Sequence, residues 1–382
     1  MKKSIGLLLL FAFGPALHAQ APDGYYDNAT GTGYTLKTQL HTIIKANHTD
    51  RGYDRLKDLY KDNSPINGFR DKYYENDDTV LDIYSENPDG RDPYNYNPNS
   101  SLGAGQEGGG FNREHLVPQS FFDEYRTSPM KADAFHVWPT DGKVNGWRSN
   151  FAFGNVTNRN AASPCNSGAT NMPCKSLNGT TKGKYIYDNS ITVVEPIDEF
   201  KGDIARAILY FATRYEDLLG DFYRTTRSNS KVMFDGSRNQ AISNEFLSQL
   251  ITWHIQDPVS QRELDINDLV YQYQGNRNPY IDHPEFVEQI WGSHLIANDF
   301  DYQTRTDIDV FTTNHQSAVI ALKNQSKSID QVFVYTMNGQ MVQKNSYAKG
   351  QSKIEIKLPS KGVFIIKVVG KGLEINRKIV IK

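Results

Sequence analysis

FNREHLVP at residues 111–118 and DGKVNGWRSN at residues 141–150 are the two segments on which the chemistry of this chain depends. The first places a carboxylate, Glu114, directly before an imidazole, His115. Successive side chains of a strand point to opposite faces, so one site can use both residues only if the strand ends or bends there. Pro118 limits how far such a strand can continue. We therefore expect a strand that ends close to His115.

The second segment predicts a helix that begins after Asp141, because aspartate is a favoured residue for capping the first turn. On that helix Asn145, Arg148 and Ser149 share one face, since residues three and four positions apart are neighbours. The two segments together predict a strand end that faces a helix. Arg148 would then lie close to a bound phosphate group.

These residue types suit the hydrolysis of a phosphodiester, which needs a base to deprotonate a water and positive charge around the transition state. His115 is the candidate base, because a reference pKa near 6.5 leaves the ring largely neutral at neutral pH. The rate is then expected to fall as the pH drops through that pKa. Glu114 and Asn145 offer oxygen ligands of the type that Mg²⁺ or Ca²⁺ prefers.

A Glu-His pair is a weak signal by itself, because most such pairs are surface residues without a role. The zinc-protease pattern His-Glu-x-x-His does not occur in the sequence, which excludes that class of hydrolase. The function therefore depends on which other residues accompany the pair.

The N-terminus has the features of a secretory signal: two lysines, an apolar segment at residues 5–13, a Gly-Pro pair and the small residue Ala19. We expect residues 1–19 to be removed. The apolar segment is too short to span a bilayer, and no later segment approaches the twenty apolar residues that a span needs. The chain is predicted to be exported without a membrane span.

The sequence holds two cysteines, Cys165 and Cys174. In an exported chain such a close pair most simply forms a disulfide, which would contribute about 2–3 kcal/mol by closing a short loop. A two-cysteine metal site is the alternative, but it lacks clustered histidine or cysteine partners.

Charge is unevenly distributed along the chain. Residues 306–382 carry 12 basic and five acidic side chains, and Lys2 and Lys3 add two positive charges. Since the formal net charge of the whole chain is −2, residues 20–305 carry a net charge of −11. Binding of nucleic acid usually depends on Lys and Arg at the phosphates, so an acidic body argues against it unless a bound cation and a local basic cluster compensate.

Periodicity predicts a helix-rich body with few strands. Residues 85–110 are dense in Pro, Asn, Asp and Gly and predict a loop. We expect strands at 79–84 and 191–194, and helices at 34–47, 53–61, 197–219, 244–255, 259–273 and from about residue 284 onward.

Beyond about residue 305 the pattern changes to alternating strands. Asn338-Gly339 is a strong hairpin signal between two apolar runs. Strands are expected at 332–335, 341–342, 354–356, 363–369 and 373–381. The overall prediction is an α+β fold, with a helix-rich domain at residues 20–304 and a small β-sandwich at residues 305–382.

Asn112-Arg113-Glu114-His115 and several later segments together resemble the bacterial endonuclease I family, which comprises secreted, nonspecific nucleases of the ββα-metal (His-Me finger) class. The resemblance covers roughly residues 24–292. The further matching residues are Pro118, Ser120, Asp133, 135–136 (FH), 139–146 (PTDGKVNG), 148–150 (RSN), 153–154 (FG), 195–203 (EPIDEFKGD), 275–279 (GNRNP) and 281–284 (IDHP).

The resemblance implies His115 as general base and Glu114 and Asn145 as ligands of Mg²⁺, with Mn²⁺ or Ca²⁺ as alternatives. It also implies cleavage of DNA, and often RNA, to 5′-phosphate products. The phosphate-contacting arginine sits at differing places in the family, and Arg148 is our candidate. His136 is assigned either to substrate contact or to support of the site. The other substrate-binding candidates are Arg113, Lys143, Asn150 and Arg159, of which Arg113, Lys143 and Arg159 form the expected basic cluster.

The tail resembles a C-terminal sorting domain of type IX secretion. The features it shares are Asn338-Gly339-Gln340, Leu358-Pro359, Gly362-Val363-Phe364 and the basic end at residues 377–382. That resemblance implies contact with the secretion machinery, passage across an outer membrane, removal of the tail, and release or attachment to the cell surface. An ordinary β-sandwich binding module is the alternative.

Two functions are therefore open. One is a secreted, monomeric endonuclease that acts on extracellular nucleic acid. The other is a catalytically silent protein on the same scaffold, which binds nucleic acid or adheres to the cell surface. The presence of Glu114, His115 and Asn145 together favours the first.

Overall fold

The computed structural model describes residues 21–103, 105–122, 128–165, 172–224, 229–292 and, in the C-terminal part, most residues between 308 and 381. The predicted signal at residues 1–19 and the predicted boundary near residue 305 lie outside the described residues. Residues 21–292, called the body below, share one large hydrophobic core, and the C-terminal strands share a second. Within the described ranges, no helix has both the length and the apolar composition that a bilayer crossing requires.

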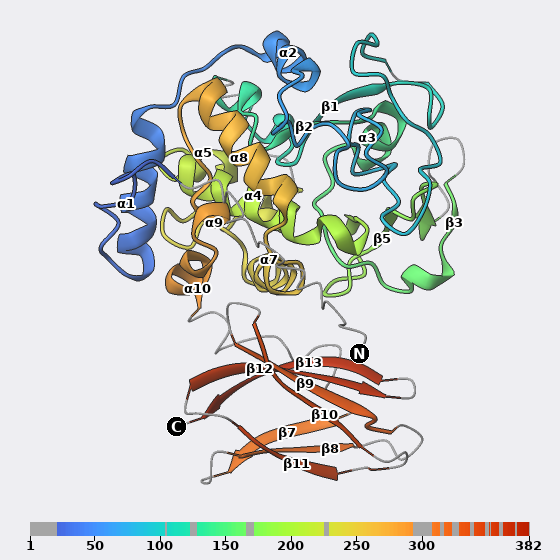
Figure 1. The fold of residues 1–382 in the computed structure, drawn as a ribbon, viewed down its shortest axis with the longest axis vertical. Helices are drawn as coiled ribbons and strands as arrows, with labels where there is room; N and C mark the ends of the chain where they lie inside the picture. The colour runs from blue at the N-terminus through green and yellow to red at the C-terminus, as the bar shows by residue number, and fades with distance from the viewer. Residues whose placement is uncertain are drawn as a thin grey trace, which may run out of the picture.

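The helices of the body agree closely with those expected from periodicity (Figure 1). The predicted helix at 53–61 is a 3-10 turn followed by α2, and the predicted helix at 197–219 is a 3-10 turn and α4, which ends earlier than expected. The bounds are α1 (Gly33–Ala46), α2 (Leu56–Lys61), α3 (Gly142–Arg148), α4 (Lys201–Arg214), α5 (Leu219–Arg224), α6 (Ser230–Met233), α7 (Asn244–Gln256), α8 (Gln261–Gln274), α9 (Pro279–Asp282) and α10 (Glu285–Trp291).

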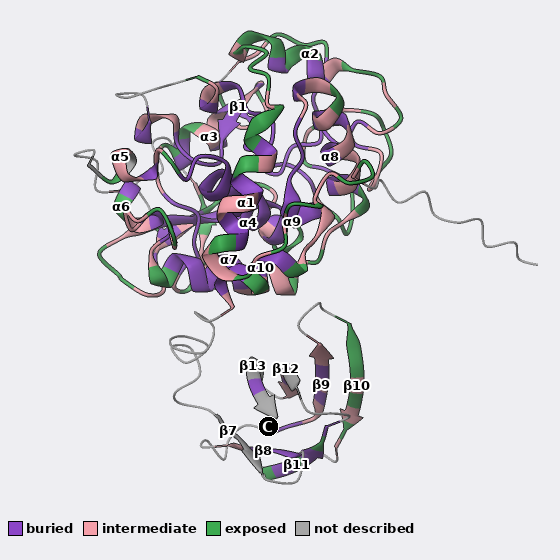
Figure 2. Ribbon diagram, turned by 90° about the vertical axis from the view of Figure 1, so that its left-hand side faces the viewer, coloured by how far each residue is buried: buried purple, intermediate pink, exposed green. Residues whose placement is uncertain are grey.

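Helix α4 is the centre of the body. Every residue from Gly202 to Arg214 is buried, and Figure 2 shows the helix surrounded by other elements. It packs against α1, α7 and α9. A helix buried on all sides must also bury its polar residues, and Arg206 does so by pairing with both carboxylate oxygens of Glu263 in α8, at 2.5 and 2.6 Å. This ion pair joins α4 to α8.

The body holds two small sheets. Strands β1 (Phe111–His115) and β2 (Val137–Asp141) form an antiparallel pair. The other sheet has the order β3-β4-β5-β6, with β3 parallel to β4 and the remaining neighbours antiparallel. Its strands are β3 (Ser163–Pro164), β4 (Cys174–Lys175), β5 (Thr181–Lys184) and β6 (Thr192–Glu195).

The prediction of a strand at residues 79–84 is wrong. Only Val80 makes a bridge there, to Arg70, and the chain then turns at Asp82. The carboxylate of Asp82 accepts a hydrogen bond from the Tyr84 N–H, and its carbonyl accepts one from the Glu86 N–H. Residues 80–86 are all buried, so the apparent alternation did not mark a strand with one solvent-facing side. The loop predicted to follow, at 85–110, has no helix or strand among its described residues.

The C-terminal strands form the predicted β-rich region, as two sheets with the orders β10-β9-β12-β13 and β11-β8-β7. Side chains from both sheets meet in one core; Ile354 and Ile356 of β11 are buried while Lys353, Glu355 and Lys357 are exposed, as the alternation predicts. The proposed turn at Asn338-Gly339 lies outside the described residues. The bounds are β7 (Ile308–Thr313), β8 (Ser317–Leu322), β9 (Gln331–Thr336), β10 (Met341–Ser346), β11 (Lys353–Lys357), β12 (Gly362–Gly370) and β13 (Leu373–Ile381).

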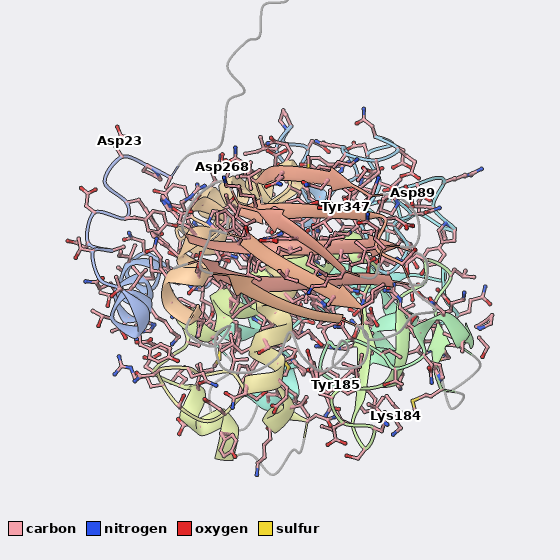
Figure 3. All side chains as sticks on the ribbon, turned by 90° about the horizontal axis from the view of Figure 1, so that it is seen from below. Asp23, Asp89, Lys184, Tyr185, Asp268 and Tyr347 are labelled. Atoms are coloured by element: carbon pink, nitrogen blue, oxygen red, sulfur yellow. A yellow bond between two sulfur atoms is a disulfide. The ribbon has the colours of Figure 1, made fainter. Side chains whose placement is uncertain are left out.

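Charged side chains cover the outside of the body. Asp23 and Asp89 are exposed, and Figure 3 shows both at the edge of the molecule. Several carboxylates of the body are buried, Asp71, Glu86 and Asp133 among them.

Candidate active site

Strands β1 and β2 and helix α3 form a compact strand–strand–helix unit. The register pairs Phe111 with Asp141 and His115 with Val137, so β1 ends at His115 as expected. Helix α3 begins directly after β2 and packs against both strands (Figure 1). The predicted cap is confirmed, because the Asp141 carboxylate accepts hydrogen bonds from the N–H groups of Lys143 and Val144, both at 2.7 Å. A strand end thus faces a helix.

Long connections hold this unit in the body. The segment between β1 and β2 is anchored through Asp133, whose carboxylate accepts hydrogen bonds from Tyr210 and Tyr215 at 2.9 and 2.7 Å and from Gln274 at 2.8 Å. Burial alone would raise the pKa of the Asp133 carboxyl, but the neighbouring His48 and His136 and the hydrogen bonds from Gln274 and Tyr215 keep this pKa below its usual value. The backbone that leads into β2 is therefore fixed against α4 and α8.

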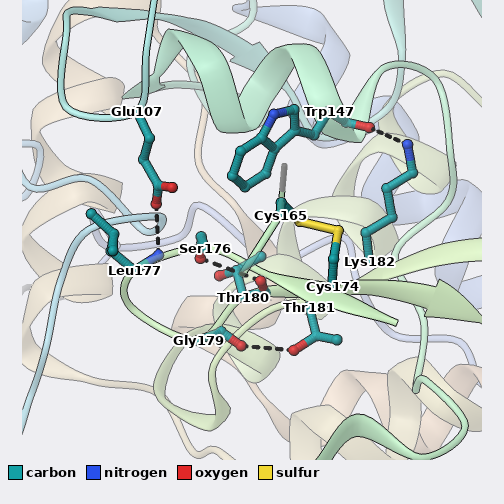
Figure 4. The surroundings of a disulfide bond; sticks show 10 residues. All are labelled: Glu107, Trp147, Cys165, Cys174, Ser176, Leu177, Gly179, Thr180, Thr181 and Lys182. Atoms are coloured by element: carbon teal, nitrogen blue, oxygen red, sulfur yellow. Dashed lines mark hydrogen bonds between the residues drawn. A yellow bond between two sulfur atoms is a disulfide. The ribbon is translucent and has the colours of Figure 1, made fainter. Parts of the chain in front are cut away.

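On the other side, the sheet that carries Cys174 contacts the end of α3 through Lys182 (Figure 4). Cys165 and Cys174 are joined, as predicted. Lys182 of the adjacent β5 donates to the carbonyl of Trp147 in α3 at 2.9 Å, and its ammonium group lies 4.5 Å from the ring centre of Phe151. The cysteine pair thus braces the sheet on which α3 rests.

Glu114 is buried within this unit, with 1% of its surface exposed. Its Oε1 accepts a hydrogen bond from the Tyr84 hydroxyl at 2.7 Å and lies 3.3 Å from Arg148 Nη1. Burial raises the pKa of Glu114, although Arg148 and the Tyr84 hydroxyl oppose the shift. Both contacts fall on Oε1, which leaves Oε2 for another partner.

His115 is 7% exposed and contacts a different set of residues. Its Nε2 lies 3.1 Å from the carbonyl oxygen of Lys131, and its ring stacks on Tyr53 with a centroid distance of 5.6 Å. Phe122 and His136 also lie against the ring. A carbonyl can only accept, so this hydrogen bond places the proton on Nε2 and leaves Nδ1 as the basic nitrogen.

The pKa of His115 differs from the value expected for an exposed imidazole. Burial, and after it the neighbouring His136, lowers the pKa of His115 to about 3. The ring therefore stays neutral throughout the physiological range. The expected loss of rate around pH 6.5 does not follow for this imidazole, because its titration lies well below that pH.

Arg148 is 1% exposed and is bound to the end of β1. It donates to the carbonyl oxygen of His115 at 2.6 Å and to that of Leu116, in addition to its ion pair with Glu114. Its guanidinium also lies 4.6 Å from the ring centre of Phe153. These contacts place Arg148 inside the scaffold that orients Glu114 and His115.

Asn145 lies on the half-buried side of α3. Its Nδ2 donates to the carbonyl oxygen of Arg113 at 3.2 Å, which fixes the amide and leaves Oδ1 for another partner. Lys143, on the same helix, is also half-buried. The structure thus brings Glu114, Asn145 and Arg148 onto the interface between β1 and α3, while the His115 ring lies among Tyr53, Phe122 and His136.

The other predicted substrate contacts lie in three different settings. The guanidinium of Arg113 lies 3.6 Å from the Tyr53 ring centre and 3.3 Å from Asp54. His136 is completely buried beneath His115, with Nε2 2.7 Å from the Met130 carbonyl oxygen, and burial lowers the pKa of His136 to about 4.

The last two candidates lie away from His115. Arg159 pairs with Glu195 at 2.9 Å and Asp198 at 3.2 Å. Asn150 accepts a hydrogen bond from Asn229 at 2.8 Å. Asn229 lines a pocket of about 720 Å³ whose walls do not include Glu114, His115 or Asn145. Arg159 is thus neutralised by two carboxylates, which reduces the local basic cluster.

Three residues that shape the site were not predicted from the sequence. Tyr84 lies in the turn that follows Asp82, and Tyr53 begins the 3-10 turn before α2. The ammonium group of Lys131 lies 4.8 Å from the Tyr53 ring centre, so Arg113 and Lys131 place two cations beside His115. Their roles depend on tertiary contacts, and a backbone carbonyl such as that of Lys131 leaves no mark in a sequence.

Comparison with known proteins identifies two regions of the chain. The profile of the Endonuclease I family matches residues 32–285, and that of the secretion system C-terminal sorting domain matches residues 314–382. The extracellular ribonuclease of Bacillus subtilis (strain 168) is 33% identical over 285 residues, which cover 74% of this chain and 83% of that protein.

Two further relatives match more weakly. The extracellular ribonuclease of Bacillus amyloliquefaciens is 32% identical over 269 residues, which cover 70% of this chain and 78% of that protein. Endonuclease-1 of Buchnera aphidicola is 25% identical over 184 residues, which cover 44% of this chain and 58% of that protein.

Proposed function

The chain belongs to the endonuclease I family and is a secreted nuclease with a type IX sorting domain, and on this premise we propose that it is a monomeric, metal-dependent endonuclease without sequence preference. We further propose that it cleaves both DNA and RNA and leaves 5′-phosphates, with the strand–strand–helix unit as a His-Me finger. Two relatives are named extracellular ribonucleases, which supports activity on RNA, and one is named an endonuclease, which supports cleavage within the nucleic-acid chain.

The observation that carries this proposal is the hydrogen bond between His115 Nε2 and the Lys131 carbonyl. Because that bond holds the proton on Nε2, the lone pair of Nδ1 is free to accept a proton from a water. The low pKa keeps the imidazole unprotonated, and stacking on Tyr53 fixes the plane of the ring. His115 is therefore oriented as a general base.

The donor set suits a hard divalent cation such as Mg²⁺. Glu114 Oε2 and Asn145 Oδ1 are the oxygens left by the contacts on Glu114 Oε1 and Asn145 Nδ2, and oxygen ligands completed by water are those that Mg²⁺ uses. When bound, the cation supplies positive charge to the phosphate oxygens. Mn²⁺ and Ca²⁺ are the alternative ions.

Arg148 and His136 act as positioning residues in this account. Arg148 fixes the backbone at His115 and the carboxylate of Glu114. His136 packs under His115 from a completely buried position. Contacts to the phosphate backbone fall instead to Arg113 and Lys131, the two cations that flank Tyr53, with Lys143, Asn150 and Arg159 further out.

Plasmid nicking tests the proposal. With Mg²⁺ the full chain should relax supercoiled DNA, and EDTA should abolish the reaction. His115→Ala should lower kcat by about 10²–10⁴, the usual contribution of a general base. Ser260→Ala is the control, because Ser260 caps α8 and is not among the proposed catalytic, metal-binding or phosphate-binding residues. Cleavage that persists in EDTA, or that His115→Ala leaves unchanged, would contradict the proposed mechanism. DNA binding without any cleavage in Mg²⁺ would instead favour a catalytically silent binding protein as the function of this scaffold.

A further inference from the structure

Three carboxylates gather at a place that shares no residue with the candidate active site. Asp71, Glu75 and Glu86 each bring one oxygen within 4.8 Å of the oxygens of the other two. Two oxygens that bind the same Ca²⁺ at 2.3–2.6 Å are at most about 5 Å apart. The spacing of the three oxygens is therefore that of ligands around a single ion.

Glu86 distinguishes this group from an ordinary acidic surface. Its side chain is 0% exposed, and both of its carboxylate oxygens are buried without a hydrogen-bond partner in the described structure. A buried carboxylate is normally paired, hydrogen-bonded or bound to a metal, because its desolvation is otherwise uncompensated. Both oxygens of Glu86 thus have free lone pairs in the group.

The other two carboxylates are held in place by backbone groups. Asp71 accepts hydrogen bonds from the N–H groups of Tyr73, Tyr74 and Asn76, at 3.0–3.1 Å. Glu75 Oε1 accepts a hydrogen bond from the Asp92 N–H at 3.0 Å, which leaves Glu75 Oε2 to bind an ion. Glu75 is more exposed than Asp71 and Glu86, so an ion can reach the group from solvent. The ligands are pre-positioned and accessible.

The charges around Glu86 are mostly negative. Burial, and then the charges of Asp92, Asp71 and Glu75, raise the pKa of Glu86 to about 9. Arg262 is the basic residue that opposes this shift, but its guanidinium already pairs with Asp203 at 2.5 Å and donates to the Gly68 carbonyl. The surrounding described residues therefore do not neutralise the group.

We propose that Asp71, Glu75 and Glu86 bind a structural Ca²⁺ ion, separate from the cation proposed at Glu114 and Asn145. Calcium fits better than Mg²⁺, because Mg²⁺ keeps most of its waters and takes one or two carboxylates, whereas Ca²⁺ accepts several carboxylates in irregular geometry. The loop that carries the ligands is irregular, and a secreted protein meets Ca²⁺ at concentrations that fill sites with dissociation constants of about 10⁻⁴–10⁻³ M.

The ion would hold the loop that supports the active site. Two residues before Glu86, Tyr84 donates its hydroxyl to Glu114. Asp82, on the same turn, accepts a hydrogen bond from the N–H of Asp141, the residue that caps α3. An ion that fixes Glu86 would therefore restrain the turn at residues 82–86, which contacts both Glu114 and the start of α3.

Thermal unfolding of the full chain tests the proposal. The protein is stripped with EDTA and melted alone, with 10 mM CaCl₂ and with 10 mM MgCl₂. Ca²⁺ should raise Tm by about 5 °C, the shift expected at roughly a hundred times the dissociation constant, and Mg²⁺ should raise it less. Asn145→Ala should keep the Ca²⁺ shift, since Asn145 belongs to the other site.

Glu86→Gln and Glu75→Gln should both lose the part of the Ca²⁺ shift that Asn145→Ala keeps. Without metal each should melt at or above the temperature of the wild type, because the substitution removes repulsion among the carboxylates. Glu75 is the safer position if Glu86→Gln fails to fold, since its side chain is more exposed. Isothermal titration with CaCl₂ should find one site fewer in Glu75→Gln than in the wild type.

Several results would overturn the proposal. One is a Tm of the wild type that does not respond to Ca²⁺. Another is a Ca²⁺ shift in Glu75→Gln that is as large as in the wild type. A third is a shift that disappears in Asn145→Ala, which would put the ion at the active site. An equal shift with Mg²⁺ would overturn the assignment to calcium. None of these results depends on nuclease activity, so the two proposals can fail separately.

Discussion

At the scale of single residues, two opposite pKa shifts distinguish Glu114 from His115. Burial raises the pKa of the Glu114 carboxyl and lowers that of the His115 imidazole to about 3. Protonation of Glu114 removes a metal ligand, whereas protonation of His115 removes the base. As the pH falls from 7, Glu114 takes up a proton first, and His115 only near pH 3.

This order predicts how activity depends on pH. Below neutral pH the rate should fall as Glu114 becomes protonated. A higher Mg²⁺ concentration should move this fall in rate to lower pH, because the metal and the proton compete for the carboxylate. The measurement is kcat/KM on a short DNA duplex from pH 4 to 8 at two Mg²⁺ concentrations. A fall in rate near pH 6.5 that does not depend on the Mg²⁺ concentration would mean that His115 titrates normally and that its surroundings differ from those described above.

Arg148 tests whether a buried cation positions the site or contacts the substrate. Arg148→Ala removes the donor to two backbone carbonyls and leaves Glu114 buried without its counter-charge, so it should lower the free energy of unfolding by about 3–5 kcal/mol. The measurement is urea denaturation. Arg55→Ala is the matched control, because Arg55 is 71% exposed in its ion pair with Asp58 and should change stability by less than about 1 kcal/mol.

Arg148→Ala should also lower activity in proportion to the loss of the site's geometry. If the variant is as stable as the wild type and only KM rises, Arg148 is a substrate contact, as its position in the sequence first indicated.

At the scale of elements, the cap of α3 connects stability to the site. Asp141 accepts from the N–H groups of Lys143 and Val144, from the Tyr96 hydroxyl and from the Gly108 N–H. Asp141→Ala should therefore cost about 2–4 kcal/mol, the sum of a lost cap and two unpaired donors, and should displace Asn145.

Ser260→Ala serves as the comparison for Asp141→Ala. Ser260 closes a capping box at the start of α8 and does not contact the strand–strand–helix unit. It should cost about 1 kcal/mol and leave nuclease activity intact. Circular dichroism melts and plasmid nicking measure both effects. Equal losses of activity in the two variants would show that activity follows general stability and not the position of α3.

Elements with regular apolar spacing were predictable from the sequence. Helices α1, α7 and α8 lie within a few residues of their predicted bounds, because their packing faces repeat at the helical period. The predicted helix at 197–219 ended early, at Arg214, because the chain turns where Glu216 is bound by Lys37 of α1. Such a long-range ion pair is not visible in a local pattern.

The site was predictable to a similar degree. The end of β1 at His115 and the cap at Asp141 followed from the local chemistry of Pro118 and aspartate. The burial of Arg148 and His136, and the stacking of Tyr53 on His115, could not be predicted, because each depends on segments distant in sequence. Local rules thus located the reactive groups, and tertiary packing set their pKa values and partners.

At the scale of the whole molecule, the two hydrophobic cores share no residue. The body should therefore fold without the C-terminal strands. Removal of residues 293–382 should leave the Tm of the body and its kcat on DNA unchanged, as measured by calorimetry and nicking. A large fall in Tm would show that the sorting domain stabilises the body.

The same truncation changes the charge of the protein. Because residues 293–382 carry a net charge of +6, the truncated chain should bind DNA more weakly at low salt, and the difference should vanish as NaCl is raised. This effect appears in KM and not in kcat.

In the proposed site, Glu114 and Asn145 share one divalent cation while His115 faces a water beside it. Crystals of the full chain grown with Mn²⁺ measure this directly through the anomalous difference map. We expect a peak within about 2.2 Å of both Glu114 Oε2 and Asn145 Oδ1, with a bound water within hydrogen-bond distance of His115 Nδ1. Absence of a peak between these two oxygens, or a peak whose waters His115 Nδ1 cannot reach, would contradict it.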